Sequence, residues 1–66
     1  MTFAKALAAL NKGAVIYIPG REATTSTRIS PRGEVQRAFG KGWITRGSIG
    51  IAEIMSTDWE VEGTED

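Results

Sequence analysis

No uninterrupted apolar run in this 66-residue chain is longer than AVIYI, which covers only residues 14–18. A membrane-spanning helix needs about 20 apolar residues, so this run predicts a short buried strand and not a membrane span. The opening stretch, MTFAKALAAL, has neither the long apolar core nor the cleavage site of a secretory leader. We therefore expect one small domain in the cytoplasm.

A domain of this size buries little apolar surface and usually needs an additional stabilising device. The sequence contains no cysteine and no histidine, which excludes disulfides, histidine-based metal sites and histidine general bases. Self-association remains open, so we expect a homo-oligomer, either a homodimer or a dimer of dimers. We expect neither catalysis nor a cofactor. In the one conceivable acid pair, Glu53 falls on the polar face of a short predicted helix, and Asp58 is expected to start the final strand.

The formal net charge of zero hides an asymmetry along the chain. All eight Lys and Arg lie in residues 1–46 with only two acids, which gives +6, whereas residues 47–66 hold six acids and no base, which gives −6. Two interpretations stay open: the two parts attract each other in the fold, or the basic part binds an anion. We expect a compact domain over 1–62 and a disordered acidic tail over 63–66.

The clearest helix is predicted over MTFAKALAALNKG. Its apolar residues Phe3, Ala6, Leu7 and Leu10 recur at helical spacing, Thr2 is a candidate N-cap, and Gly13 is a candidate end. The strand AVIYI should follow, covered by this helix on one face, and Pro19-Gly20 should end it. After it, REATTST predicts a polar loop that leads into a Thr-rich edge strand.

The segment RISPRGEVQRAFGKG is ambiguous from its own residues. Pro31 and Gly33 favour a turn with a glycine bulge that joins a strand near Arg28–Ser30 to one near Glu34–Phe39. The alternative is a helix, because Ser30 is a good N-cap, Pro31 a good first residue, and Gly40 a good end. The residues alone do not separate the two.

The last third predicts a short second helix and a closing strand. In SIGIAEIM, Ser48 is the expected cap, and Ile51, Ile54 and Met55 share one face. In DWEVE, Trp59 and Val61 alternate with acids, which is typical of a half-buried strand. We therefore interpret Trp59 as a core or interface residue. The predicted class is α+β: a small antiparallel sheet, an N-terminal amphipathic helix, and a short second helix before the closing strand.

Both ends of the chain resemble a known family. MTFAKALAALNKG, a strand and then Pro19-Gly20 are similar to an opening of Met, a polar residue, Phe, AL-x-x-L and glycine. IAEIMSTDWEV is similar to a short helix followed by Asp-Trp-x-Val. Over roughly half its length the chain thus resembles the small phage family typified by the second type of Thoeris anti-defence protein. The Asp-Trp-x-Val strand is the more specific of the two patterns.

The middle of the chain departs from the family pattern. Where members carry Gly-Trp-Asn after the first strand, this chain has Gly20-Arg21-Glu22, so an aromatic base-stacking contact is missing and Arg21 replaces it only in part. Members also have a turn that ends in glycine, for which Gly33 is the counterpart, and this favours the hairpin. The family's second Trp position falls on Phe39 or on Trp43.

The resemblance implies a binding protein that is not an enzyme. Such proteins trap cyclic nucleotide signals of bacterial immune systems, such as cyclised ADP-ribose species or cyclic oligonucleotides, in pockets at subunit interfaces, without cleaving them. A ligand of this kind needs aromatic faces and charge-assisted donors, and FGKGWITRGS offers both. The candidate ligand-binding residues are Arg21, Phe39, Trp43, Thr45, Arg46 and Ser48.

Three alternatives to this interpretation remain. FGKGWITRGS is also compatible with a flexible loop around an ordinary buried Trp. The protein as a whole is compatible with an inhibitor of a host immune protein. The basic residues between Arg21 and Arg46 are compatible with single-stranded nucleic acid, although the acidic end of the chain should repel such a polymer.

Overall fold

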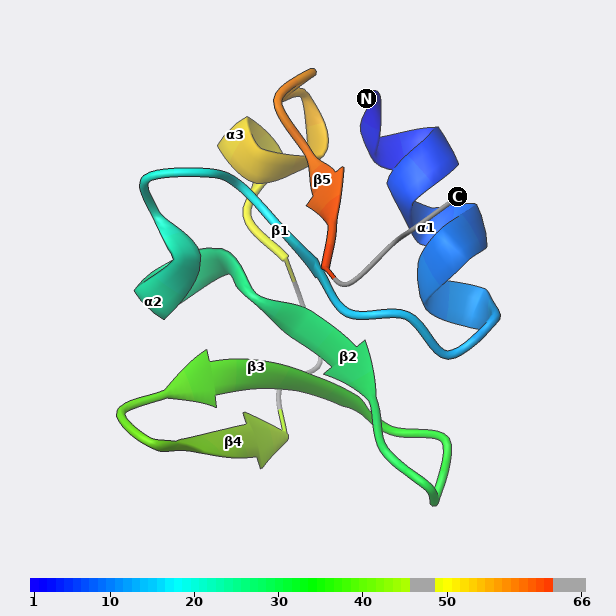
Figure 1. The fold of residues 1–66 in the computed structure, drawn as a ribbon, viewed down its shortest axis with the longest axis vertical. Coiled ribbons are helices and arrows are strands. Elements are labelled where there is room, and N and C mark those ends of the chain that lie inside the picture. Colours follow the sequence, from blue (N-terminus) through cyan, green and yellow to red (C-terminus); the bar gives the residue numbers. More distant parts are fainter. Residues whose placement is uncertain (46–48, 63–66) are drawn as a thin grey trace.

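A computed structural model describes residues 1–45 and 49–62 of the chain, and Figure 1 shows its arrangement. The elements are, in order, α1 (Phe3–Asn11), β1 (Ile16–Tyr17), α2 (Glu22–Thr25), β2 (Thr27–Ile29), β3 (Val35–Phe39), β4 (Gly42–Thr45), α3 (Ile51–Ile54) and β5 (Glu60–Val61). The predicted α+β class is confirmed, with an antiparallel sheet, an N-terminal helix, and a short helix before the final strand.

Helix α1 forms where its periodicity predicts it. The hydroxyl of Thr2 accepts a hydrogen bond from the backbone N–H of Lys5 at 3.4 Å, and Gly13 ends the helical region with a φ of +100°. Ala6 and Leu10 are buried, and Phe3 packs against them. Leu7 departs from the predicted buried face, because it is exposed on the solvent side of the helix.

The sheet has the strand order β4-β3-β2-β1-β5, and every neighbouring pair is antiparallel. Strand β2 therefore lies in the middle of the sheet, and the predicted Thr-rich edge strand is wrong. Thr27 is fully buried there, because its hydroxyl donates to the carbonyl oxygen of Thr25 at 2.8 Å and so needs no water.

The ambiguous segment after β2 is a hairpin. The N–H of Gly33 donates to the carbonyl of Ser30 at 2.8 Å, the N–H of Ser30 donates to the carbonyl of Glu34 at 2.8 Å, and Gly33 has a φ of +85°. The Ser30 hydroxyl also accepts from the N–H groups of Arg32 and Glu34, each at 3.2 Å. A turn with a positive-φ glycine favours the hairpin over the helix, as the predicted bulge requires.

A one-turn helix, α2, replaces part of the predicted polar loop. The carbonyl of Arg21 accepts from both the N–H and the hydroxyl of Thr25, at 3.0 and 2.8 Å. The Thr25 hydroxyl in turn accepts from the N–H of Ile18 at 2.9 Å, which fixes the turn to β1. Hydrogen bonds from its own backbone N–H and from that of Gly20 hold the pKa of Glu22 below its ordinary value.

Helix α3 begins two residues later than predicted, with Gly50 at its N-cap, and Ser48 lies outside the described residues. The expected cap by Ser48 is therefore wrong. None of the α3 residues is buried, and the predicted apolar face of Ile51, Ile54 and Met55 is exposed to solvent. Polar contacts attach the helix: the Trp59 indole Nε1 donates to the Glu53 carbonyl at 2.8 Å, and the Glu53 carboxylate pairs with Arg37.

The core lies between α1 and the strands β1 and β5. Its buried apolar members are Ala6, Leu10, Ile16, Ile18 and Trp59. The rings of Phe3 and Trp59 meet with centroids 5.5 Å apart, so α1 packs directly on the closing strand. Trp59 is fully buried, Val61 is partly buried, and Glu60 and Glu62 are exposed, which confirms the predicted alternation and the core interpretation of Trp59.

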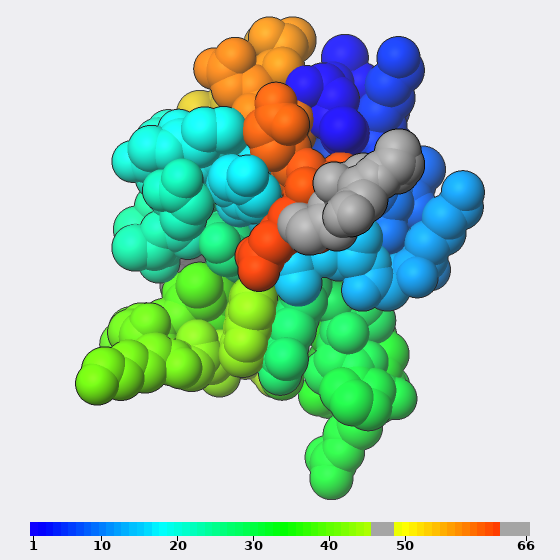
Figure 2. Space-filling model, in the orientation of Figure 1, coloured from blue at the N-terminus to red at the C-terminus, as the bar shows by residue number. Residues whose placement is uncertain are grey.

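No helix of the described residues is both long and apolar enough to span a bilayer. The tail predicted over 63–66 lies outside the described residues. In the space-filling view of Figure 2, the hairpin turns after β2 and after β3 project away from the body of the molecule at the lower edge of the picture.

Candidate functional site

The sheet has two faces of different character. Directly paired residues of neighbouring antiparallel strands point to the same side, and successive residues of one strand point to opposite sides. One face carries a row of directly paired residues that runs across all five strands: Val61, Ile16, Thr27, Arg37 and Ile44. We call it the covered face, because the core and α1 lie on this side.

The opposite side is called the open face. Its described members are the pair Tyr17 and Glu60, the pair Ala38 and Trp43, the row Arg28, Gln36 and Thr45, and Glu62, which follows Val61 at the edge of β5. Not one of these side chains is buried, whereas the covered face includes the buried Ile16, Thr27 and Arg37. The open face is therefore the part of the described sheet that is accessible to a ligand.

On the open face, an arginine and a tryptophan stack on each other over the strands β2 to β4. The guanidinium carbon of Arg28 lies 4.6 Å from the centroid of the Trp43 ring, well within the range of a cation–π contact. Arg28 comes from β2 and Trp43 from β4, so the two side chains meet diagonally across β3. The contact keeps a planar cation and a planar aromatic ring together on a surface that water reaches.

Polar neighbours hold this pair in position. Arg28 Nε donates to Gln36 Oε1 at 2.8 Å, and Gln36 Nε2 lies 3.5 Å from Thr45 Oγ1, at the long limit of a hydrogen bond. The guanidinium therefore uses one N–H on Gln36, while its other N–H groups remain as donors for a ligand. We call these four residues, Arg28, Gln36, Trp43 and Thr45, the stacking cluster.

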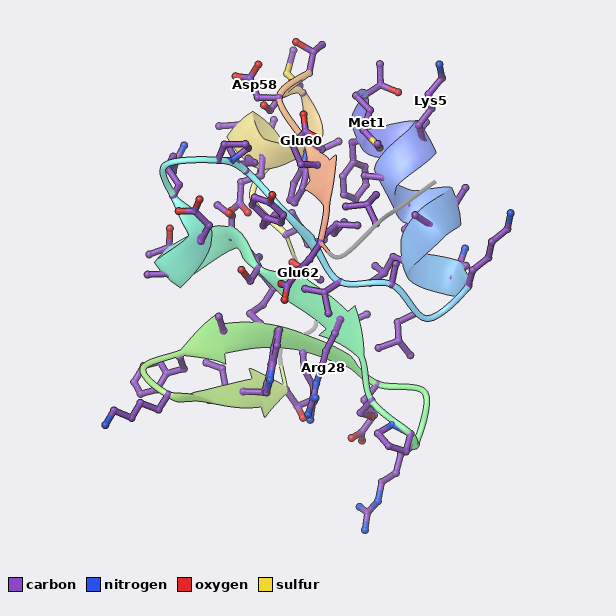
Figure 3. All side chains as sticks on the ribbon, viewed as in Figure 1. Met1, Lys5, Arg28, Asp58, Glu60 and Glu62 are labelled. Atoms are coloured by element: carbon purple, nitrogen blue, oxygen red, sulfur yellow. The ribbon has the colours of Figure 1, made fainter. Side chains whose placement is uncertain are left out.

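A shallow pocket of about 390 Å³ adjoins the stacking cluster on the side of the β2–β3 turn. It is lined by Arg28, Ser30, Pro31, Arg32, Glu34, Gln36 and Thr45. Two arginines against one glutamate give it a positive balance, and Figure 3 shows Arg28 extending from β2 toward this side. An anionic group beside a stacked ring would therefore find charge-assisted donors here.

The structure brings together two of the residues that the sequence predicts for the site. Trp43 and Thr45 both lie on β4 and point to the open face. Phe39 points to the covered side, since it alternates with Ala38, and its side chain is 67% exposed. Arg21 is the exposed N-cap residue of α2 and is not among the residues of the open face. Arg46 and Ser48 lie outside the described residues.

Two members of the stacking cluster, Arg28 and Gln36, are missing from the sequence-based prediction. Their positions follow once the Ser30–Gly33 turn is accepted as a hairpin, because the register then places Gln36 directly opposite Arg28. The sequence FGKGWITRGS is likewise not a loop in its described part: it ends β3, turns at Gly40-Lys41 and forms β4.

A second pocket, of about 470 Å³, lies on the covered side between α2, the β3–β4 hairpin and the start of α3. Arg37 and Glu53 provide its polar wall, and Phe39 and Ile44 its apolar wall. Arg37 is 6% exposed, and its Nη2 also donates to the Thr24 carbonyl at 2.9 Å. Because Glu53 already neutralises Arg37, this pocket has no charge to offer an anion.

Neither site has the arrangement of a metal centre. Within residues 1–45 and 49–62, no three acidic side chains gather closely enough to hold a metal ion.

No family model, no curated protein and no solved structure matches the chain.

Proposed function

We propose that the protein binds a nucleotide on the open face and sequesters it without cleaving it. The observation that carries the proposal is the Arg28 guanidinium stacked on Trp43 on the uncovered side of the sheet. A base has a flat, polarisable face, and stacking on an aromatic side chain contributes about 1–3 kcal/mol per base. An arginine plane offers a base a second surface of the same kind.

The phosphates of such a ligand would lie in the shallow pocket beside the stacking cluster. Arg28 has N–H groups that Gln36 does not occupy, and Arg32 lines the same pocket. Arginine recognises phosphate through two parallel hydrogen bonds, which a lysine does not provide. Base and phosphate would thus be bound by adjoining residues, as the size of a nucleotide requires.

The class of nucleotide comes from the family resemblance. The Asp58-Trp59-Glu60-Val61 segment and the opening helix support a role as a phage anti-defence protein that sequesters a cyclic nucleotide immune signal in the host cytoplasm. The ligand would be a cyclic ADP-ribose-like species or a cyclic oligonucleotide. In this proposal the missing Gly-Trp-Asn contact at Gly20-Arg21-Glu22 is replaced by Trp43 and Arg28, which are stacked on each other.

The proposal includes a homo-oligomer. Among the described residues, five apolar side chains form the buried core, while Ile51 of α3 and its C-cap residue Met55 remain exposed at 76% each. A chain with so small a core gains stability when such residues are covered by a second copy. Sedimentation velocity at micromolar concentration should show a dimer or larger species; a stable monomer of 7.1 kDa would contradict this part.

The test of binding compares Arg28→Ala with Arg21→Ala. Each variant removes one arginine side chain that is exposed or half-exposed, but only Arg28 belongs to the stacking cluster. Arg21 supports α2 through its backbone carbonyl, which the Arg21→Ala variant keeps. Calorimetric titration of the wild-type protein with a panel of cyclic nucleotides should identify a saturable ligand. Arg28→Ala should weaken that ligand by about 1.5–3 kcal/mol, the range for hydrogen bonds to a charged group, and Arg21→Ala by much less.

A panel that produces no saturable binding would contradict the proposal, and so would equal losses in the two variants. The single-stranded nucleic acid alternative has one observation in its favour, namely that Arg32 and Lys41 lie at the turns of the two hairpins that flank the stacking cluster. A linear oligonucleotide belongs in the same titration for this reason.

A further inference from the structure

The open face carries acids at one edge as well as the stacking cluster. Glu60 is the direct partner of Tyr17 in the β5–β1 pair, and the N–H of Glu62 donates to the carbonyl of Val15 at 2.8 Å. Both carboxylates are exposed, and neither has a hydrogen bond or an ion pair with a described residue. In Figure 3 the labelled Glu60, Glu62 and Arg28 follow one another down the middle of the view.

We propose that Glu60 and Glu62 form an acidic margin that limits the length of the anion that the open face accepts. This inference rests on the proposed nucleotide binding and concerns the specificity of the same face. The stacking cluster occupies the strands β2 to β4, whereas Glu60 lies on β5 and Glu62 directly after it. A ligand confined to the first three strands meets arginine, amide and aromatic groups, whereas a longer one meets two carboxylates.

The spacing of the strands sets the length. Neighbouring strands lie about 4.8 Å apart, so β5 lies about 10 Å from β2 and about 19 Å from β4. One or two nucleotides fit over the stacking cluster without approaching the margin. A polymer that continues across the sheet over β1 brings phosphates within about 5 Å of β5. This distance is shorter than the Debye length of about 8 Å at physiological salt, so the repulsion is incompletely screened.

The residues between cluster and margin do not offset this repulsion. Tyr17 of β1 and Val15, which directly precedes β1, lie between the acids and Arg28, and neither carries a positive charge. Among the described residues, the other basic side chains of the region, Arg32 and Lys41, lie at the hairpin turns after β2 and β3. On the β5 side, the N-terminal ammonium is bound to the carbonyls of Thr57 and Trp59. The face therefore changes from basic to acidic in one direction, from β4 to β5.

The experiment compares a double variant of the margin with a charge-matched control. Glu60→Gln with Glu62→Gln removes two negative charges from the open face. Glu22→Gln with Asp58→Asn removes two negative charges from exposed positions outside its rows, one in α2 and one before β5. Each protein is titrated with cyclic di-AMP and with a ten-nucleotide oligothymidylate at low and high salt, and its melting temperature is recorded.

The margin variant should bind the oligothymidylate about tenfold more tightly than the wild-type protein at 50 mM salt, and the gain should shrink as salt rises. Its affinity for cyclic di-AMP should change by less than about twofold, and the control should gain much less for the oligothymidylate. Equal gains in the two variants, or no gain in the margin variant, would overturn the margin while leaving cyclic di-AMP binding intact. A protein that binds neither probe in any form would overturn the proposed function together with the margin.

Discussion

Among the described residues, each face of the sheet carries one tryptophan and one arginine, and the two faces use them differently. On the covered face, Trp59 is fully buried, and Arg37 is 6% exposed and paired with Glu53. On the open face, Trp43 and Arg28 are half-buried and stack on each other. The same two residue types therefore hold the fold together on one side and remain accessible to solvent on the other.

The two pairs differ in the hydrogen-bond and ion-pair partners of their polar groups. Protein groups bond most of the covered pair: the Trp59 indole donates to the Glu53 carbonyl, and Arg37 Nη2 contacts the Glu53 carboxylate and the Thr24 carbonyl, while the buried Arg37 Nε has no partner among the described residues. The open pair uses one hydrogen bond to Gln36 and leaves the other guanidinium N–H groups as donors for a ligand. Satisfied polar groups contribute to stability, while unsatisfied exposed ones can contribute to binding at little cost in stability.

The largest expected effect tests the two tryptophans against each other. Trp59→Ala should lower the free energy of unfolding by about 3–5 kcal/mol, since it removes a fully buried aromatic ring from a small core. Trp43→Ala should lower it by about 1 kcal/mol or less, because Trp43 lies on the open face. Urea denaturation of both variants measures the difference, and equal losses would remove the distinction between the faces.

The next effect concerns the two arginines. Glu53→Met leaves the buried Arg37 without its carboxylate and should cost about 2–3 kcal/mol, less than for a fully buried pair because the Glu53 side chain is 19% exposed. The double variant Arg37→Met with Glu53→Met should recover part of this loss, since no buried charge then remains unpaired. Arg28→Met on the open face should cost less than about 1 kcal/mol. Denaturation midpoints that show no recovery in the double variant would contradict the ion-pair account.

The smallest effect sharpens the role of the open arginine. Arg28→Lys keeps the charge but loses the planar fork that contacts Trp43 and that, in the proposed function, pairs with phosphate. We expect stability to stay within about 0.5 kcal/mol of the wild-type value, and affinity for the ligand to recover only partly relative to Arg28→Ala. Full recovery, measured by calorimetry, would show that Arg28 acts as a charge alone and that stacking is irrelevant.

The covered side could be predicted well from the sequence, because its pattern is local. Helical spacing located α1, and the alternation of Trp59 and Val61 with acids located the closing strand. The short α2 was missed because its stability depends on threonine hydroxyls that bond to neighbouring backbone groups, which apolar periodicity does not reveal. The start of α3 was misplaced because Gly50 takes the cap position without a side-chain hydrogen bond.

The candidate site depends on register, which the sequence alone left open. The family resemblance and the residue types in FGKGWITRGS predict Trp43 and Thr45, but their partners Arg28 and Gln36 come from other strands. The partners become predictable only when the Gly33 turn is known to be a hairpin, because a helix there would separate Arg28 from Gln36. Phe39 was grouped with Trp43 by proximity in the sequence, yet strand alternation places the two on opposite faces.

The most direct test of the central claim uses the two tryptophan indoles as reporters, one for each face. In a ¹H–¹⁵N spectrum they give two side-chain N–H signals, which Trp43→Phe assigns. Addition of a cyclic nucleotide that binds in calorimetry should shift the Trp43 indole signal and leave that of Trp59, which donates to the Glu53 carbonyl at 2.8 Å, in place. Binding that shifts the Trp59 signal alone, or neither signal, would contradict a ligand site on the open face.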